Sequence, residues 1–331
     1  MIIIKPKFEI IEQQYDADLL KNMLKHIELC GRTCYKSEDK ITDTSYEKFV
    51  KMLIEAEHGA MLEHGTVYLK ISIPKKAWFK SVVDKYYGNP HSKVNNTFDD
   101  YDYHYFITTN YRVLIENGWL DDLKYMCVPT EYHEKRYTVK FTIHLAVARD
   151  INRHRVQSIG EESTRYCNYL KEKFGGELNY IEPVFLSDEE KQYLNNTNER
   201  LSFQSMCNQI GNGDYSLFEA IDYFIFALEA CEFSYLNLIR CGWKPQQASL
   251  VLPLDTKTES VHTGFASDWV HFFNLRALGT TGAPRPSAKE VAWPLMEEFF
   301  TRGYISRNDV NEVKYNYIIE KYPNIEDYIK L

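Results

Sequence analysis

The residues best suited to chemistry are concentrated between Arg153 and Tyr166. This stretch contains three arginines, one histidine, two glutamates and two serines, and it closely follows the apolar residues 145–148. Arginines at the end of a buried element commonly bind phosphate or carboxylate, because the planar guanidinium group donates two parallel hydrogen bonds to either. A solvated loop with local Arg–Glu pairs would show the same residue types. The stretch alone therefore allows two interpretations, an anion-binding site and a solvent-exposed loop.

Three other kinds of chemistry fit the sequence less well. Two histidines flank a glutamate at a helix-to-strand junction (His58, Glu63 and His64), but their spacing matches neither HExxH nor a standard zinc pattern. We expect no metal there, and a capped loop or a ligand-lining loop remains possible. Cys167 lies two residues past Arg165 but has no other activating feature, and Ser163 has His154 nearby but no third orienting group, so neither is expected to be a nucleophile. GxSxG, Walker A and GxGxxG motifs are absent, which argues against Rossmann and P-loop sites.

The composition restricts how an anion could be bound. The 331 residues carry a formal net charge of −8, with 44% hydrophobic and 26% charged residues. A chain of this size can bury a sizeable core, and its acidic balance argues against a general nucleic-acid binder, which would have a basic face or tail. An anionic ligand would therefore meet a local arginine cluster inside an acidic protein.

The cysteines and the lengths of the apolar segments bear on the cellular compartment of the protein. The seven cysteines are scattered and form no CxxC pair, as is typical of the reducing cytoplasm. No apolar run reaches the roughly 18 residues that a membrane span needs, and residues 1–6 are too short for a signal peptide. We expect a cytoplasmic protein without a membrane span.

Hydrophobic periodicity predicts the strands that would position the arginine-rich stretch. A first strand is expected at 1–6, continuing through 8–12, and two alternating strands are expected at 67–73 and 137–143. We expect the last two to pair with each other. A short helix after the strand at 137–143 would end at the arginine-rich stretch.

The same patterns predict the helices. Gly31 is expected to end a helix over 18–29. Thr44 with Glu47, and Ser287 with Glu290, form two capping-box patterns at helix starts. The remaining helices are expected at 111–117, 214–241 and 267–277, and from Pro245 and Asp309 onward. Residues 75–136 are rich in loop signals, and we interpret them as an insertion that decorates the core or extends a subunit interface.

Four stretches together resemble the flavin-dependent thymidylate synthases (the ThyX family). Residues 153–166 are similar to the family signature RHRxxSxNExSxRY. Residues 58–64, 248–253 and 269–276 are similar to its HESxLEH, ARxVLP and LxHFLxLR elements. The similarity covers about residues 15–73, 137–170 and 230–300.

The resemblance implies a fold and an assembly. It implies an α/β protein of the α+β type, with a curved, mainly antiparallel sheet flanked by helices. All of residues 1–331 would form one domain, with an insertion at about 75–136 and a C-terminal helical extension at 305–331. The family assembles as a homotetramer whose active sites are shared between subunits.

The resemblance also implies a reaction. dUMP would be methylated to dTMP, with 5,10-methylenetetrahydrofolate as the carbon donor and NADPH-reduced FAD as the reductant. The family uses no cysteine nucleophile on the uracil ring. The flavin would carry the redox chemistry while the protein positions the reactants.

The resemblance assigns roles by position. Arg276 matches the arginine that polarises the uracil and favours ionisation at N3, so it is the expected catalytic residue. Such a role is physically reasonable, because a fixed cation stabilises negative charge that develops in a water-poor site. The expected FAD contacts are His58, Ala60, Arg153, His154, Arg155, Glu161 and His271. The expected dUMP contacts are Asp150, Arg153, Glu161, Ser163, Thr164, Arg165 and Arg276.

Five positions depart from the family pattern. Gly160 replaces the asparagine of the signature, and Gly59 and Ala60 replace the glutamate and serine of the HES loop. Asp150 replaces a glutamine of the nucleotide site, and Ser249 replaces an arginine that would meet the dUMP phosphate from a second subunit. Two alternatives therefore stand beside the synthase: a ThyX-like methylase of another uridine nucleotide, and a non-catalytic regulator that binds flavin or nucleotide.

Overall fold

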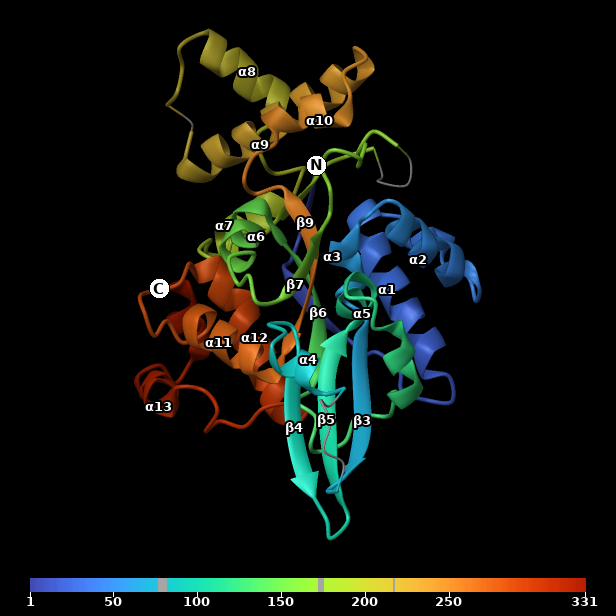
Figure 1. The fold of residues 1–331 in the computed structure, drawn as a ribbon. Helices are drawn as coiled ribbons and strands as arrows, with labels where there is room; N and C mark the ends of the chain where they lie inside the picture. The colour runs from blue at the N-terminus through green and yellow to red at the C-terminus, as the bar shows by residue number, and fades with distance from the viewer. Residues whose placement is uncertain (77–81, 172–175, 217) are drawn as a thin grey trace.

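A four-stranded antiparallel sheet lies at the centre of the molecule, where β6, β7 and β9 are labelled in Figure 1. Its strand order is β2–β6–β9–β7. The computed structural model describes residues 1–331 apart from 77–81, 172–175 and 217. Helices flank the sheet, which confirms the expected mixed α/β architecture, whereas the curvature of the sheet stays a prediction. The strands are β2 (Lys7–Ile11), β6 (Arg136–His144), β9 (Lys257–Phe265) and β7 (Ser158–Glu161).

Alternation along β6 divides the sheet into an apolar face and a polar face. Val139, Phe141 and Ile143 are fully buried in one cluster with residues of α6, α11 and α12. Thr138 points to the other face, where its hydroxyl is 3.0 Å from His26 Nε2 of α1. Successive side chains of a strand point to opposite faces, so one strand contacts two helical layers. The helices are α6 (Leu145–Ile151), α11 (Ala266–Arg276) and α12 (Pro286–Thr301) on the apolar face, and α1 (Leu19–Tyr35) on the polar face.

A second antiparallel sheet has the order β3–β5–β4 (Figure 1). The expected pairing of residues 67–73 with 137–143 is therefore wrong: β3 pairs with β5, and β6 pairs with β2 and β9. The true partner β9 was not predicted, because it is buried at almost every position and lacks the alternation of a half-buried strand. The strands of the second sheet are β3 (Thr66–Pro74), β4 (Lys93–Phe98) and β5 (Asp102–Asn110).

The segment 75–136 contributes strands to the second sheet and side chains to a hydrophobic core. It supplies β4 and β5 of the second sheet, and its Ile107 and Leu114 share a buried cluster with Met23 of α1. It also contains α5 (Tyr111–Glu116), which confirms the helix expected there, and α4 (Asp84–Tyr87). Its status as an insertion relative to shorter proteins stays a prediction.

Several helix ends differ from the expectation. α1 continues through Gly31 to Tyr35 and ends at Lys36, whose φ is 48°. Gly31 serves packing, because a Cβ there would lie 2.7 Å from the Phe49 ring of α2 (Ser45–Glu55). Neither capping box forms as expected. Thr44 makes no side-chain capping bond, and α12 begins at Pro286, so Ser287 lies inside the helix.

The remaining elements complete both ends of the molecule. β1 (Ile2–Ile4) does not continue into β2 but pairs in parallel with β8 (Asn179–Ile181). Segment 305–331 forms two helices whose Ile318 and Tyr328 join the cluster around α11 and α12. No helix among the described residues is both long and apolar enough to cross a bilayer. The other helices are α3 (Gly59–Leu62), α7 (Asp188–Asn195), α8 (Phe203–Gly211), α9 (Ala220–Arg240), α10 (Pro245–Ala248), α13 (Glu312–Lys321) and α14 (Ile325–Lys330).

Candidate active site

The arginine-rich stretch links the end of α6 to β7. Its turn is closed by backbone bonds, from the His154 amide to the Ile151 carbonyl at 3.1 Å and from the Gln157 amide to the His154 carbonyl at 3.0 Å. This turn buries His154 and leaves Arg153 and Arg155 exposed on either side of it. The expected position of the arginines at a helix end is therefore confirmed.

Two consecutive glutamates of the stretch point to opposite faces of the sheet. Glu161 accepts hydrogen bonds from Asn152 Nδ2 at 2.7 Å and from Thr258 Oγ1 at 3.1 Å, on the side of α6. Glu162 accepts from Lys257 Nζ at 2.8 Å and from the Tyr169 hydroxyl at 3.1 Å. Burial raises the pKa of Glu161. The alternation of β7 thus leaves Glu161 at the candidate site and fixes Glu162 in a buried charge network.

Arg276 is held in place from two directions. Its Nε donates to His154 Nε2 at 3.0 Å, and its Nη2 donates to the Asp150 carbonyl at 2.7 Å. Burial, together with the charge of Arg276, lowers the pKa of His154 to about 4, so the imidazole is neutral near pH 7. Because Nε2 accepts from Arg276, the ring proton lies on Nδ1. His271 packs edge-on against His154, with ring centroids 5.7 Å apart.

Asp150 does not stand as an isolated carboxylate. Its Oδ2 accepts a hydrogen bond from Arg285 Nε at 2.9 Å, in a partly exposed ion pair. Arg285 precedes the first turn of α12, whereas Asp150 lies near the end of α6. The pair therefore brings a third arginine close to Arg276 and Arg153, a neighbour that was not predicted from the sequence.

The end of the stretch packs against the C-terminal end of α1. The Ser163 amide donates to the Cys34 carbonyl at 3.1 Å, and the Tyr166 ring lies 6.4 Å from the Tyr35 ring. The Arg165 guanidinium group lies 5.6 Å from the centre of the Tyr166 ring. Within the described part of the chain, Arg153, Arg155 and Arg165 make no ion pair. All three are therefore available to an anion.

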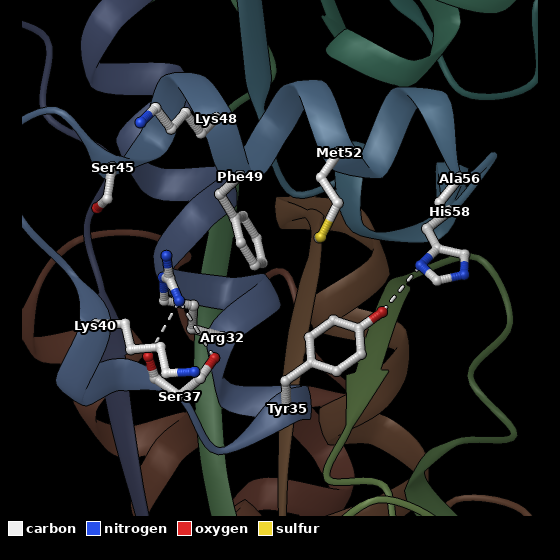
Figure 2. A pocket seen from close by; sticks show the side chains of 10 residues that line it. All are labelled: Arg32, Tyr35, Ser37, Lys40, Ser45, Lys48, Phe49, Met52, Ala56 and His58. Atoms are coloured by element: carbon white, nitrogen blue, oxygen red, sulfur yellow. Dashed lines mark hydrogen bonds between the residues drawn. The ribbon is translucent and has the colours of Figure 1, made fainter.

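His58 lies at one end of a pocket between α1 and α2, which we call the α1–α2 pocket (Figure 2). Its volume is about 590 Å³, and Tyr35 and Phe49 are among its walls. The Tyr35 hydroxyl is hydrogen-bonded to His58 Nδ1 at 2.9 Å. Ala60 lies in α3, which begins directly after this histidine.

The structure thus gathers the expected site residues in two groups. Asp150, His154, His271 and Arg276 are connected by direct contacts around the ends of α6 and α11. His58 belongs to a second group at the α1–α2 pocket, which reaches the stretch through Tyr35 and Tyr166. Thr164 is half-buried and the Ser163 amide contacts α1, and neither residue contacts Arg276 among the described contacts.

Comparison with known proteins assigns the chain to a family. A sequence model of the family described as thymidylate synthase complementing protein matches residues 129–301, more than half of the chain. The chain belongs to this family. The match contains the arginine-rich stretch, β9 and Arg276, whereas His58 and the α1–α2 pocket lie outside it.

Solved structures and curated proteins add little to this assignment. Two structures of the UMP/dUMP methylase PolB from Streptomyces cacaoi, one bound with 5-Br UMP and one with 5-Br dUMP, each have 14% sequence identity and a TM-score of 0.38. Each comparison covers 91% of this chain and 92% of the other. Likeness at this level carries no argument about the site. No curated protein matches the chain.

Packing explains one departure from the thymidylate synthase complementing protein pattern. Gly160 lies on β7, and a Cβ there would lie 2.7 Å from Cys34 Sγ and 2.9 Å from Met61 Cε. An asparagine at this position would have to displace the side chains of Cys34 in α1 and Met61 in α3. The lack of a side chain at Gly160 therefore allows α1 and α3 to pack closely against β7.

Restoring the asparagine is expected to destabilise the protein. Overpacking of this kind costs about 1–3 kcal/mol, so Gly160→Asn should lower the free energy of unfolding by that amount in urea titrations. Gly88→Asn is the matched control, because a Cβ at Gly88 would have no atom within 4 Å. Equal stability of the two variants would contradict this explanation of Gly160.

Sequence reasoning missed several residues that surround the candidate site. The missed positions share contacts with the two glutamates or with Asp150: Lys36, Asn152, Lys257, Thr258, Glu259 and Arg285. The only available signal was the alternation of charge at Lys257 and Glu259, which would have required β9 to be predicted. No group of three or more metal-ligating side chains is found in the described ranges.

Proposed function

We propose that this protein methylates dUMP at C5 to give dTMP, with 5,10-methylenetetrahydrofolate as the carbon donor and NADPH-reduced FAD as the reductant. The observation that carries the proposal is the fixed position of Arg276 within the family-matched segment. Its guanidinium group is oriented by His154 and by the Asp150 carbonyl, and no carboxylate of the described residues lies within salt-bridge distance of it. An arginine held in this way keeps its full charge for a ligand.

In this proposal Arg276 acts on the uracil ring. A cation beside the ring stabilises negative charge at N3 and the adjacent carbonyl oxygens, which makes C5 more nucleophilic. His154 is the positioning residue for Arg276, since its neutral Nε2 is already used by that arginine. Glu161, held by Asn152 and Thr258, would accept hydrogen bonds from the nucleotide.

The remaining nucleotide contacts would neutralise the phosphate. Ser163, Thr164 and Arg165 are the proposed ligands, with Arg153 shared between nucleotide and flavin. Asp150 stands at a neighbouring position, where a free carboxylate would repel the phosphate. Its ion pair with Arg285 removes that objection and brings another guanidinium group to the same edge of the site.

The residues present also fit a flavin dinucleotide. Arg153 and Arg155 are exposed and make no ion pair among the described residues, as a diphosphate group requires. His58, Ala60, Glu161 and His271 would be the other contacts, with His154 packed behind His271. When bound, FAD supplies the reducing equivalents for the methyl group, and NADPH renews them.

Four of the seven cysteines are poorly suited to act as a thiolate nucleophile. Burial raises the pKa of Cys34 to about 12 and also raises the pKa values of Cys30, Cys127 and Cys231. A nucleophilic cysteine requires a lowered pKa. These thiols therefore lack the activation that an attack on the uracil ring would need.

The proposal includes assembly as a cytoplasmic homotetramer with shared active sites. Two observations support shared sites. Arginines are exposed on both sides of His154, and the His58 group is separate from the Arg276 group, so a second subunit could complete each site. Sedimentation equilibrium would measure the mass of the assembly against the 39.0 kDa of one chain.

Flavin reconstitution and genetic complementation test the proposed function. The purified protein incubated with FAD should show the absorption bands of bound oxidised flavin, and the gene should support growth of a thymidine-requiring strain without thymidine. A protein that binds no flavin and gives no growth, although it is folded and expressed, would overturn the proposal. Flavin binding without growth would favour the non-catalytic alternative.

A further inference from the structure

The α1–α2 pocket has the size and walls of a ligand site, and His58 is the only one of its lining residues among the proposed flavin and nucleotide contacts. Its volume of about 590 Å³ falls within the roughly 300–1,000 Å³ typical of small-molecule sites. Phe49, Met52 and Tyr35 form apolar and aromatic walls (Figure 2). Such walls suit a planar aromatic group, which can stack or pack edge-on against them.

The pocket is elongated along α2. Lys48 and Ala56 both line it and are eight residues apart along the helix, which corresponds to about 12 Å at 1.5 Å per residue. In Figure 2, Lys40 and Lys48 lie toward one end and His58 toward the other, with Phe49 and Met52 between them. The pocket can therefore accept an extended molecule with two chemically different ends.

The charge of the pocket is positive although the chain is acidic. Three of its lining residues are cationic, Arg32, Lys40 and Lys48, and none carries a carboxylate, whereas the whole chain has a net charge of −8. Arg32 already has a structural role, because its Nε bonds to Glu28 at 2.7 Å and its guanidinium group lies 4.6 Å from the Phe49 ring centre. Lys40 and Lys48 make no ion pair within the described residues. They are therefore available to negative groups on a ligand.

The opposite end of the pocket leads to the candidate site. His58 is hydrogen-bonded to Tyr35, and the Tyr35 ring lies 6.4 Å from Tyr166 at the end of the arginine-rich stretch. An aromatic group near His58 would consequently lie next to the proposed flavin contacts. A negatively charged tail attached to it would extend toward Lys40 and Lys48.

We propose that the α1–α2 pocket binds the p-aminobenzoyl-glutamate tail of the folate co-substrate, with Lys40 and Lys48 neutralising its carboxylates. The inference rests on the proposed function, in which a folate is the carbon donor. It adds the residues that would bind the tail of that folate. Folates carry additional γ-linked glutamates in cells, and each one adds a carboxylate. Polyglutamate forms should therefore bind more tightly than the monoglutamate form, through these two lysines.

Equilibrium binding of unreactive folates tests the inference without turnover. Folic acid and pteroyltriglutamate are titrated into the FAD-loaded protein, and dissociation constants are obtained by calorimetry. The wild-type protein should bind the triglutamate more tightly, and Lys40→Ala/Lys48→Ala should weaken its binding roughly 5- to 20-fold, as expected for two partly exposed ion pairs. The weakening should diminish at high salt, because screening removes the same interaction in the wild type.

The matched control is Lys51→Ala, which removes a lysine of α2 that is paired with Glu55 outside the pocket lining. It should leave both folate dissociation constants unchanged. Equal binding of mono- and triglutamate by the wild type, or an unchanged preference in the double variant, would overturn the inference. Weakened NADPH binding by the double variant with unchanged folate binding would assign the pocket to the dinucleotide instead and would also overturn it. A failure of the proposed function is distinguishable, because it would appear in the wild type as absent complementation.

Discussion

Arg276→Ala is expected to lower kcat by about 10²- to 10³-fold, the usual effect of removing one fixed group that stabilises developing charge. The effect follows from the geometry at the end of α11. Arg276 donates to the neutral His154 and to the Asp150 carbonyl. These two contacts fix the orientation of the guanidinium group and leave its other N–H donors and its charge for the ligand. Flavin should remain bound, because the exposed Arg153 and Arg155 are untouched. Turnover rates and the flavin absorption of the same samples provide the measurement.

The conservative variant and a distant arginine make this test specific. Arg276→Lys should recover little activity, since one ammonium group cannot bond to His154 and Asp150 with the geometry of a guanidinium fork. Arg302→Ala removes an exposed arginine paired with Glu12 and Glu298, and it should leave kcat unchanged. Normal turnover by Arg276→Ala would refute the assigned catalytic role.

Lys257→Met is expected to lower the free energy of unfolding by about 3–5 kcal/mol, because it leaves a buried carboxylate without its closest cation. Glu162 has a side chain that is 1% exposed, and Lys257 Nζ lies 2.8 Å from its Oε2 and 3.1 Å from Glu259 Oε1. Lys36 is the nearest remaining cation, at 3.8 Å from Glu162. Urea unfolding followed by circular dichroism would measure the change.

Two further variants test whether the loss of stability comes from an uncompensated buried charge or only from the loss of an ion-pair contact. Lys51→Met breaks the exposed pair with Glu55 and should change stability by less than about 1 kcal/mol. Adding Glu162→Gln to Lys257→Met should recover part of the loss, because the uncompensated charge is removed with its partner. A double variant that is no more stable than Lys257→Met would show that the carboxylate charge is not the cause.

The residues that carry the sequence signature could be placed from the sequence because their neighbours are local. The strand at β6, the short helix α6 and the turn at His154 follow one another in the chain, so their order alone brings the arginines to a helix end. The antiparallel sheet flanked by helices was likewise expected. Family resemblance selected Arg276, and the structure then placed it against His154.

The partners of these residues could not be predicted, because they come from elements without an amphipathic pattern. β9 is buried along nearly its whole length, so its sequence lacks the alternation that reveals a strand. Because β9 was not predicted, the contacts of Thr258 with Glu161 and of Lys257 with Glu162 could not be predicted either. The same limit explains the wrong pairing of 67–73 with 137–143, since β9 and β2 are the actual neighbours of β6.

Long-range packing also overrode local signals. Gly31 looked like a helix end, but the close approach of Phe49 requires a residue without a side chain inside α1. Gly160 looked like a weakened signature, although Cys34 and Met61 fill the space that an asparagine would occupy. Asp150 looked unfavourable for a phosphate until Arg285, more than a hundred residues away in the sequence, was found beside it.

Tritium release from dUMP labelled at C5 tests the central claim most directly, because methylation at C5 must displace that hydrogen. The protein loaded with FAD should release tritium to water only when 5,10-methylenetetrahydrofolate and NADPH are both present. Arg276→Ala should release it at least about 100-fold more slowly. The absence of release from dUMP by folded, flavin-loaded protein, or release from UMP but not from dUMP, would contradict the proposed reaction.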